Sequence, residues 1–173
     1  MDIRAALAKE HSKKQSQLIA HYIGGDQERF DELMDLFLHD EEWRITQRAA
    51  WVLSHCADKY LFLIQPHLPK VVAYMTKEGN HVAIRRNIVR TLAKIDIPEG
   101  LMGLVADACF TFLANPKETV AVKAFSMDIL YQMCKKEPDL AHELIPLIED
   151  NMEHNGTAGI LSKGRKILKK LKT

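Results

Sequence analysis

The chain has 173 residues, of which 47% are hydrophobic and 27% are charged, a balance typical of a folded protein with a substantial core. No apolar run approaches the ~18–20 residues of a membrane span, and the first residues lack the apolar segment of a signal peptide, so we expect a cytoplasmic protein. The cysteines Cys56, Cys109 and Cys134 form no CxxC pair and are predicted to be buried thiols in a reducing compartment.

Charge is distributed unevenly, although the formal net charge is only +1. The segment from Thr157 onward contains no acidic residue and has a formal charge of +6, which leaves −5 for residues 1–156. The basic residues of the segment are Lys163, Arg165, Lys166, Lys169, Lys170 and Lys172. Cations near a helix C-terminus interact well with the helix dipole, and no aromatic residue lies among these lysines. We therefore interpret this segment as the solvated end of the domain, with a patch for nucleic acid, acidic protein or membrane as the alternative.

Apolar residues recur with helical spacing along the whole chain, and alternation typical of strands is missing. Short helices are expected at 2–10 and 12–23, where Gly24-Gly25 ends the second. Asp26 is expected to cap a helix that runs to about Leu38. Further helices are expected at about 41–56, 66–77 (with Pro66 in its first turn, or with a start shifted by Pro69), 81–95, 99–114, 118–136, 138–153 and 157–171. The short connections between them favour antiparallel neighbours.

One apolar pattern, with positions i, i+4, i+8 and i+11, occurs four times and begins at Ile45, Ile84, Val122 and Ile160. The copies are Ile45, Ala49, Leu53 and Cys56; Ile84, Ile88, Leu92 and Ile95; Val122, Ser126, Leu130 and Met133; and Ile160, Gly164, Leu168 and Leu171. Each copy forms one face of a helix. A helix face that returns every ~40 residues indicates stacked helix pairs, that is, an α-solenoid.

The segments Arg48-Ala49-Ala50-Trp51-Val52-Leu53 and Arg85-Arg86-Asn87-Ile88-Val89-Arg90-Thr91-Leu92 give the chain its family resemblance. Over about residues 26–173 it resembles HEAT-like and armadillo-like repeat proteins. The resemblance implies an all-α fold: a right-handed α-α superhelix of about four HEAT-like helix pairs with N-terminal cap helices, whose second helices line a concave side. It also implies binding of proteins or, less often, of nucleic acid. We expect a single domain at 1–173, with cap helices in 1–25, the repeat body in 26–156 and the basic helix in 157–173.

Positions six residues beyond the start of each copy, together with the positions four residues before and after them, are predicted to lie away from the core and to line the concave surface. The candidate binding residues on this surface are Trp51, His55, Arg86, Arg90, Lys94 and Asp128. Tryptophan and arginine are enriched at binding hot spots, and arginine can hold a carboxylate through two hydrogen bonds. We therefore expect an acidic peptide segment to bind here. The alternatives are that Trp51 packs beneath the cap helices and that the arginines form a solvated face. Trp43, at the start of a helix, is predicted to pack.

No catalytic motif is evident in the sequence. It contains no HxxxH, HExxH, zinc-finger spacing, Gly-x-Ser-x-Gly or phosphate-binding loop. His142-Glu143 resembles the His-Glu pairs of HEAT-repeat di-iron hydroxylases, but those enzymes use several pairs. We therefore predict a non-enzymatic scaffold without metal or cofactor, either a monomer or a weak dimer. The alternative is a HEAT-like DNA alkylation-repair glycosylase, against which the −5 charge of residues 1–156 argues.

Overall fold

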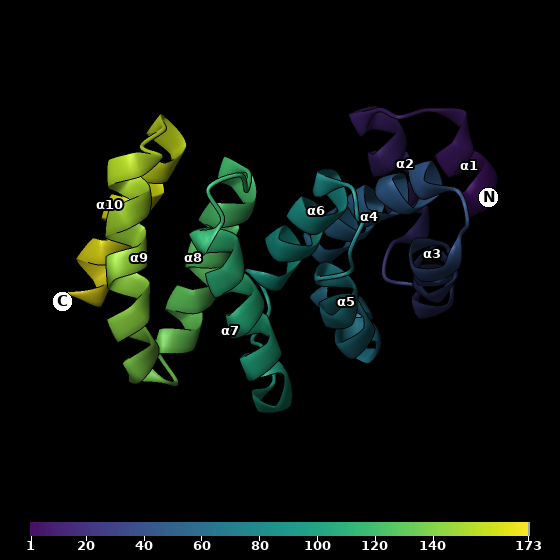
Figure 1. Ribbon diagram of the computed structural model, residues 1–173. Coiled ribbons are helices and arrows are strands. Elements are labelled where there is room, and N and C mark those ends of the chain that lie inside the picture. The colour runs from purple at the N-terminus through teal and green to yellow at the C-terminus, as the bar shows by residue number, and fades with distance from the viewer. Residues whose placement is uncertain (173) are drawn as a thin grey trace. The chain divides into compact units, whose positions relative to one another are not determined.

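The computed structural model describes residues 1–172, which fold into helices with no strand among them (Figure 1). The chain divides into two compact units, one spanning Met1–Thr91 and the other beginning at Leu92. The boundary falls at the last residue of helix α6. The single domain expected over residues 1–173 stays a prediction.

The first unit contains six α-helices and one 3₁₀-helix: α1 (Ile3–Lys9), α2 (Lys13–Ile23), α3 (Gln27–His39), α4 (Trp43–Ala57), η1 (Leu61–His67), α5 (Leu68–Met75) and α6 (Val82–Leu92). The first three begin where a side chain can accept a hydrogen bond from a free backbone N–H. Asp2, Ser12 and Asp26 each accept a hydrogen bond from the N–H three residues further on. Helix α2 ends at Gly24, whose φ of 56° lies in the left-handed region that favours glycine.

The second unit contains α7 (Glu99–Ala114), α8 (Val120–Cys134), the 3₁₀-helix η2 (Pro138–Leu140), α9 (Ala141–His154) and α10 (Ala158–Leu171). Helix α8 packs against α7, α9 and α10, and α7 also packs against α9. Figure 1 shows α9 and α10 side by side, in agreement with their contacts. Thr157 caps α10 by accepting a hydrogen bond from the N–H of Ile160.

Most helix boundaries agree with the expected ranges to within two or three residues. The helix expected at 66–77 is different, because a 3₁₀-helix, η1, comes first and α5 begins only at Leu68. Pro66 lies inside η1, and Pro69 lies in the first turn of α5, where a residue without an N–H costs no helical hydrogen bond. Helix α6 ends at Leu92, where a tight turn begins with a hydrogen bond from Ile95 N–H to the Leu92 carbonyl.

The recurring apolar pattern forms the core. All positions of its first three copies are buried, and in the fourth Ile160 and Gly164 are buried while Leu168 and Leu171 are half-buried. Glycine occurs at position 164 because α10 lies very close to α9. A Cβ there would lie only 2.5 Å from the sulfur of Met152.

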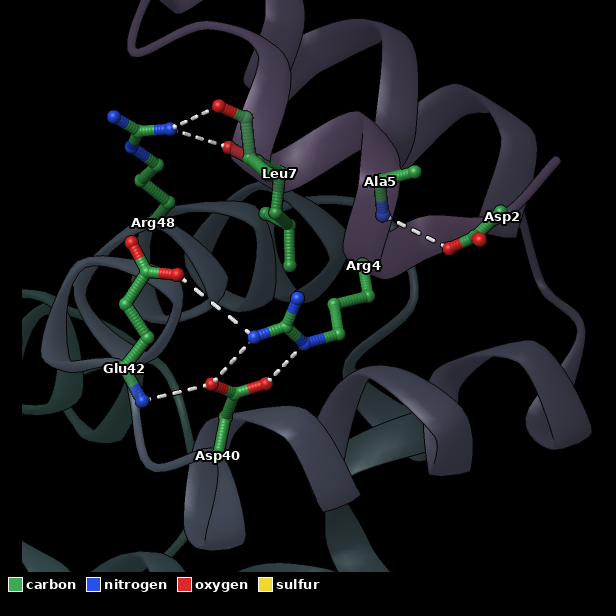
Figure 2. Close-up of polar contacts among 8 residues, drawn as sticks. Asp2, Arg4, Ala5, Leu7, Asp40, Glu42 and Arg48 are labelled. Carbon is green, nitrogen blue, oxygen red and sulfur yellow. Dashed lines mark hydrogen bonds and ion pairs between the residues drawn. The ribbon is translucent and has the colours of Figure 1, made fainter.

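Polar contacts hold α1 on the first unit (Figure 2). The Arg4 guanidinium bonds both carboxylate oxygens of Asp40, at 2.7 and 3.3 Å. Chiefly through this hydrogen bond, it holds the pKa of the Asp40 carboxyl below its ordinary value. At the other end of α1, Arg48 of α4 donates to the Leu7 and Ala8 carbonyls.

Candidate peptide-binding groove

Four side chains form a continuous row in the first unit: Trp51, His55, Asp58 and Arg90. The Trp51 and His55 rings lie 5.9 Å apart, centroid to centroid, on successive turns of α4. The Nδ1 atom of His55 is 3.8 Å from the Asp58 carboxylate. Asp58 in turn binds Arg90 of α6. The structure therefore brings together three of the residues selected from the sequence and adds a carboxylate between them.

The Arg90–Asp58 pair is a two-point contact. One guanidinium nitrogen of Arg90 is 3.0 and 2.7 Å from the two Asp58 oxygens. About 30% of each side chain is exposed, so solvent screens the pair only in part. Burial lowers the pKa of Arg90 from its ordinary value, but a guanidinium stays charged at neutral pH. The Asp58 charge is thereby largely neutralised.

A groove of about 600 Å³ lies beside this row, between α2 and the C-terminal end of α4; we call it the α2–α4 groove. His55 and Asp58 line it from the α4 side. Lys14, Leu18 and His21 line it from α2, and Lys59 and Tyr60 from the segment after α4. Leu18 is 48% exposed.

The charged side chains of the α2–α4 groove favour an anion. Lys14 and Lys59 are exposed, and Asp58 is the only carboxylate among the described lining residues. Because Arg90 neutralises Asp58, the two lysines are not offset. The groove thus combines an exposed apolar side chain with two uncompensated cations, a chemistry suited to an acidic segment with an apolar anchor.

The other predicted binding residues have different surroundings. Arg86 is exposed on α6, one turn before Arg90. Lys94 and Asp128 belong to the second unit. Lys94 as a whole residue is exposed, but its ammonium group is partly buried, and this burial lowers its pKa. Asp128 forms an ion pair with Lys163 of α10, at 2.5 Å.

The two tryptophans differ in exposure. Trp51 is half-buried, and His11, in the segment between α1 and α2, approaches its ring edge-on at 5.5 Å. Trp43 is 54% exposed, contrary to the packing predicted for it. It stacks on His81 at 5.6 Å, and the Arg44 guanidinium lies 5.5 Å from its ring centroid.

Lys14, Lys59 and Asp58 are not among the residues predicted from the sequence, because the spacing rule covers only the second helix of each pair. Lys14 lies on a cap helix, and the other two follow the end of α4. One signal was available in the sequence. Asp58-Lys59 follows directly after the first apolar copy, so these residues had to lie near its C-terminal end.

The whole sequence can be compared with known families. The family model for the HEAT repeat domain matches residues 3–171. This chain belongs to the HEAT-repeat family. A crystal structure of an engineered protein resembles this HEAT-repeat fold with a TM-score of 0.61 and 13% identity, covering 98% of this chain and 79% of the other. At that identity the likeness concerns the fold alone. No curated protein matches the sequence.

Within residues 1–172 no group of three or more His, Cys, Asp or Glu side chains could hold a metal ion. Among the described helices, none is both long and apolar enough to cross a bilayer. The three cysteines are free and buried.

Proposed function

We propose that this HEAT-repeat protein is a non-catalytic scaffold that binds an acidic segment of a partner protein in the α2–α4 groove. The observation that carries the proposal is the groove itself, with Lys14 and Lys59 on its walls and Arg90 neutralising Asp58. Complementary charge at a groove rim sets specificity and association rate. The buried thiols support a reducing, cytoplasmic setting.

Leu18 and Tyr60 supply the apolar part of the recognition. Leu18 is 48% exposed and lies within the same groove as the two lysines. An apolar side chain of the partner would cover Leu18, while carboxylates on either side reach the lysines. Apolar contact at the centre and charge at the rim is the usual anatomy of a protein interface.

The experiment measures binding of labelled peptides that share a central leucine and differ only in the number of flanking Asp or Lys residues. Fluorescence anisotropy should show affinity rising with negative charge. Lys14→Glu/Lys59→Glu should lower the affinity for the acidic peptide by about tenfold or more. The matched control is Lys9→Glu/Lys70→Glu, which makes the same change in net charge at two exposed positions outside the groove.

Two results would overturn the proposal: equal affinity for acidic and basic peptides, or equal weakening by both double variants. Arg90→Ala is a further check, because it removes the guanidinium that neutralises the Asp58 carboxylate at the groove. The affinity for acidic peptides should therefore fall in this variant as well. Heparin chromatography tests the nucleic-acid alternative. Retention to high salt, with tight binding of duplex DNA, would favour that alternative.

A further inference from the structure

A second groove, of about 510 Å³, lies in the second unit between α7 and α9; we call it the α7–α9 groove. Phe110 of α7 and Leu147 of α9 give it apolar walls. Asp107, Glu143 and Asp150 also line it, and no lysine or arginine is among its described lining residues. The groove therefore has the opposite charge to the α2–α4 groove.

Leu104 extends the apolar surface of this groove along α7. It is 64% exposed, the largest exposure among the large apolar side chains described. It lies one turn before Asp107, on the same face of the helix. Phe110 and Leu147 are half-buried and continue the apolar strip. An apolar strip flanked by carboxylates fits an amphipathic helix whose charged residues are basic.

Helix α10 of the same chain has that chemistry. Leu161, Arg165 and Leu168 follow the spacing i, i+4, i+7 and so share one face. Both leucines are only half-buried, and Arg165 and Lys166 are exposed. No acidic residue occurs from Thr157 onward. Lys163 and Lys172 already pair with Asp128 and Glu149, and the Lys170 ammonium lies 4.9 Å from the Tyr131 ring centroid, whereas Arg165 and Lys166 are exposed.

We propose that α10 of one copy docks in the α7–α9 groove of a second copy, so that the protein self-associates weakly through opposite charges. Leu161 and Leu168 would contact the apolar strip, and Arg165 on the same face would approach Asp107 and Glu143. Lys166, which points about 140° away from Leu161 around the helix, would add positive charge at longer range. Because these charges lie at an exposed rim, the association should be screened by salt. This surface is separate from the α2–α4 groove, and its test does not depend on the proposed function.

The first test measures molecular mass by sedimentation equilibrium as protein concentration rises to about 1 mM. The wild-type mass should increase with concentration in about 0.1 M salt. In about 1 M salt, where the screening length falls from ~10 to ~3 Å, the association constant should fall by about tenfold or more. A wild-type protein that stays monomeric throughout at low salt would disprove the proposal.

The second test uses charge reversal on each side of the contact. Asp107→Lys/Glu143→Lys reverses two of the groove charges, and Arg165→Glu/Lys166→Glu reverses two of the helix charges. Each double variant alone should stay monomeric. An equimolar mixture should associate again at 1:1 stoichiometry, because the basic α10 of one variant meets the acidic groove of the other and the two reversed surfaces also carry opposite charges. Circular dichroism checks that each variant retains the wild-type helix content.

Glu32→Lys/Asp35→Lys on α3 is the matched control, since it makes the same charge change at exposed positions of the first unit. It should associate as the wild type does. Failure of the mixed variants to pair, or loss of association in the α3 control, would overturn the proposal. If the wild type bound a basic amphipathic peptide of unrelated sequence but not itself, the groove would serve another partner, and self-association would be rejected.

Discussion

The guanidinium of Arg48 on α4 donates a hydrogen bond of 2.6 Å to the Leu7 carbonyl near the end of α1 (Figure 2). The same nitrogen donates to the Ala8 carbonyl at 3.0 Å. The last carbonyls of a helix have no partner within it, so Arg48 satisfies groups that water would otherwise solvate. With only seven residues, α1 is too short to be stable by itself and depends on such tertiary contacts.

We predict that Arg48→Met destabilises the protein by about 1.5 kcal/mol, the lower end of the range for hydrogen bonds to charged groups. The lower end of the range applies because Nε of Arg48 is buried without a hydrogen-bond partner in the described structure. Burying that polar atom destabilises the wild type, and substitution by methionine removes this destabilisation. Urea unfolding measures the change. Hydrogen exchange in α1 should increase more than exchange in α3.

Arg44→Met is the control for this prediction, because Arg44 lies on the same helix and is exposed. Its effect should stay within about 0.5 kcal/mol. Equal effects of the two substitutions would show that the contact with α1 contributes nothing to stability.

The tryptophans provide a second prediction, because Trp43 is 54% exposed and Trp51 is half-buried against His11 and His55. Trp51→Ala should cost about 1.5–3 kcal/mol, whereas Trp43→Ala should cost less than about 1 kcal/mol. Acrylamide should quench the Trp51→Phe protein, which retains Trp43, more strongly than the Trp43→Phe protein. Equal quenching would show that the two indoles are equally accessible.

The repeat architecture could be predicted because it is written in local spacing. Each apolar copy lies within one helix, except that Ile95 of the second copy falls in the turn after α6. Burial of Ile45, Ile84, Val122 and Ile160 follows from a pattern that needs no knowledge of tertiary contacts. The family match over residues 3–171 agrees with this prediction. The 3₁₀-helix at Leu61–His67 was missed because it has too few turns to establish a period.

The candidate site could be predicted only in part, because it depends on contacts between distant residues. Arg90 and Asp58 lie 32 positions apart, and no spacing rule indicates that a guanidinium and a carboxylate so separated will meet. Lys14 comes from a helix outside the four apolar copies. The exposure of Trp43 likewise depends on how the α3–α4 and α5–α6 connections pack around it, as its stacking on His81 illustrates.

A third prediction concerns Lys123, which is buried in the second unit. Its ammonium donates to Oδ1 of Asn151 at 2.6 Å, and the Asn151 amide donates to the carbonyls of Leu113 and Leu147. Only 2% of Lys123 is exposed. Burial lowers its pKa, and the nearby Glu118 and Asp150 charges oppose that shift.

The pKa of Lys123 is lowered in the folded state and is about 10.4 in the unfolded chain. At pH values between these two pKa values, the unfolded state binds more protons at Lys123 than the folded state does. Folding stability therefore rises with pH through that window, and the penalty for burying the charge is complete below it. The free energy of unfolding of wild type, relative to Lys123→Met, should increase between neutral pH and about pH 10. Lys9→Met, at an exposed position, should show no such trend. Parallel profiles for the two variants would contradict the prediction.

The fourth prediction concerns thiol reactivity. Burial raises the pKa of Cys56 and Cys109 to about 12 and also raises that of Cys134. Because the thiolate is the nucleophile, at pH 8 only about one in 10,000 molecules carries a reactive thiolate at Cys56 or Cys109. Cys134 is 8% exposed, against 1% or less for the other two.

In the native protein, Ellman's reagent should therefore modify Cys134 first, and the other two thiols only as the protein unfolds. Cys134→Ser should remove the early phase and leave the slow phase unchanged, whereas in denaturant every thiol of each protein should react at once. Rapid reaction of two thiols under native conditions would mean that the helices carrying them open far more often than their burial implies. In that case α4 and α7, the helices that carry Cys56 and Cys109, should also show fast amide exchange. The rate at which Ellman's reagent modifies the two remaining thiols of the Cys134→Ser protein should then match the opening rate measured by that exchange.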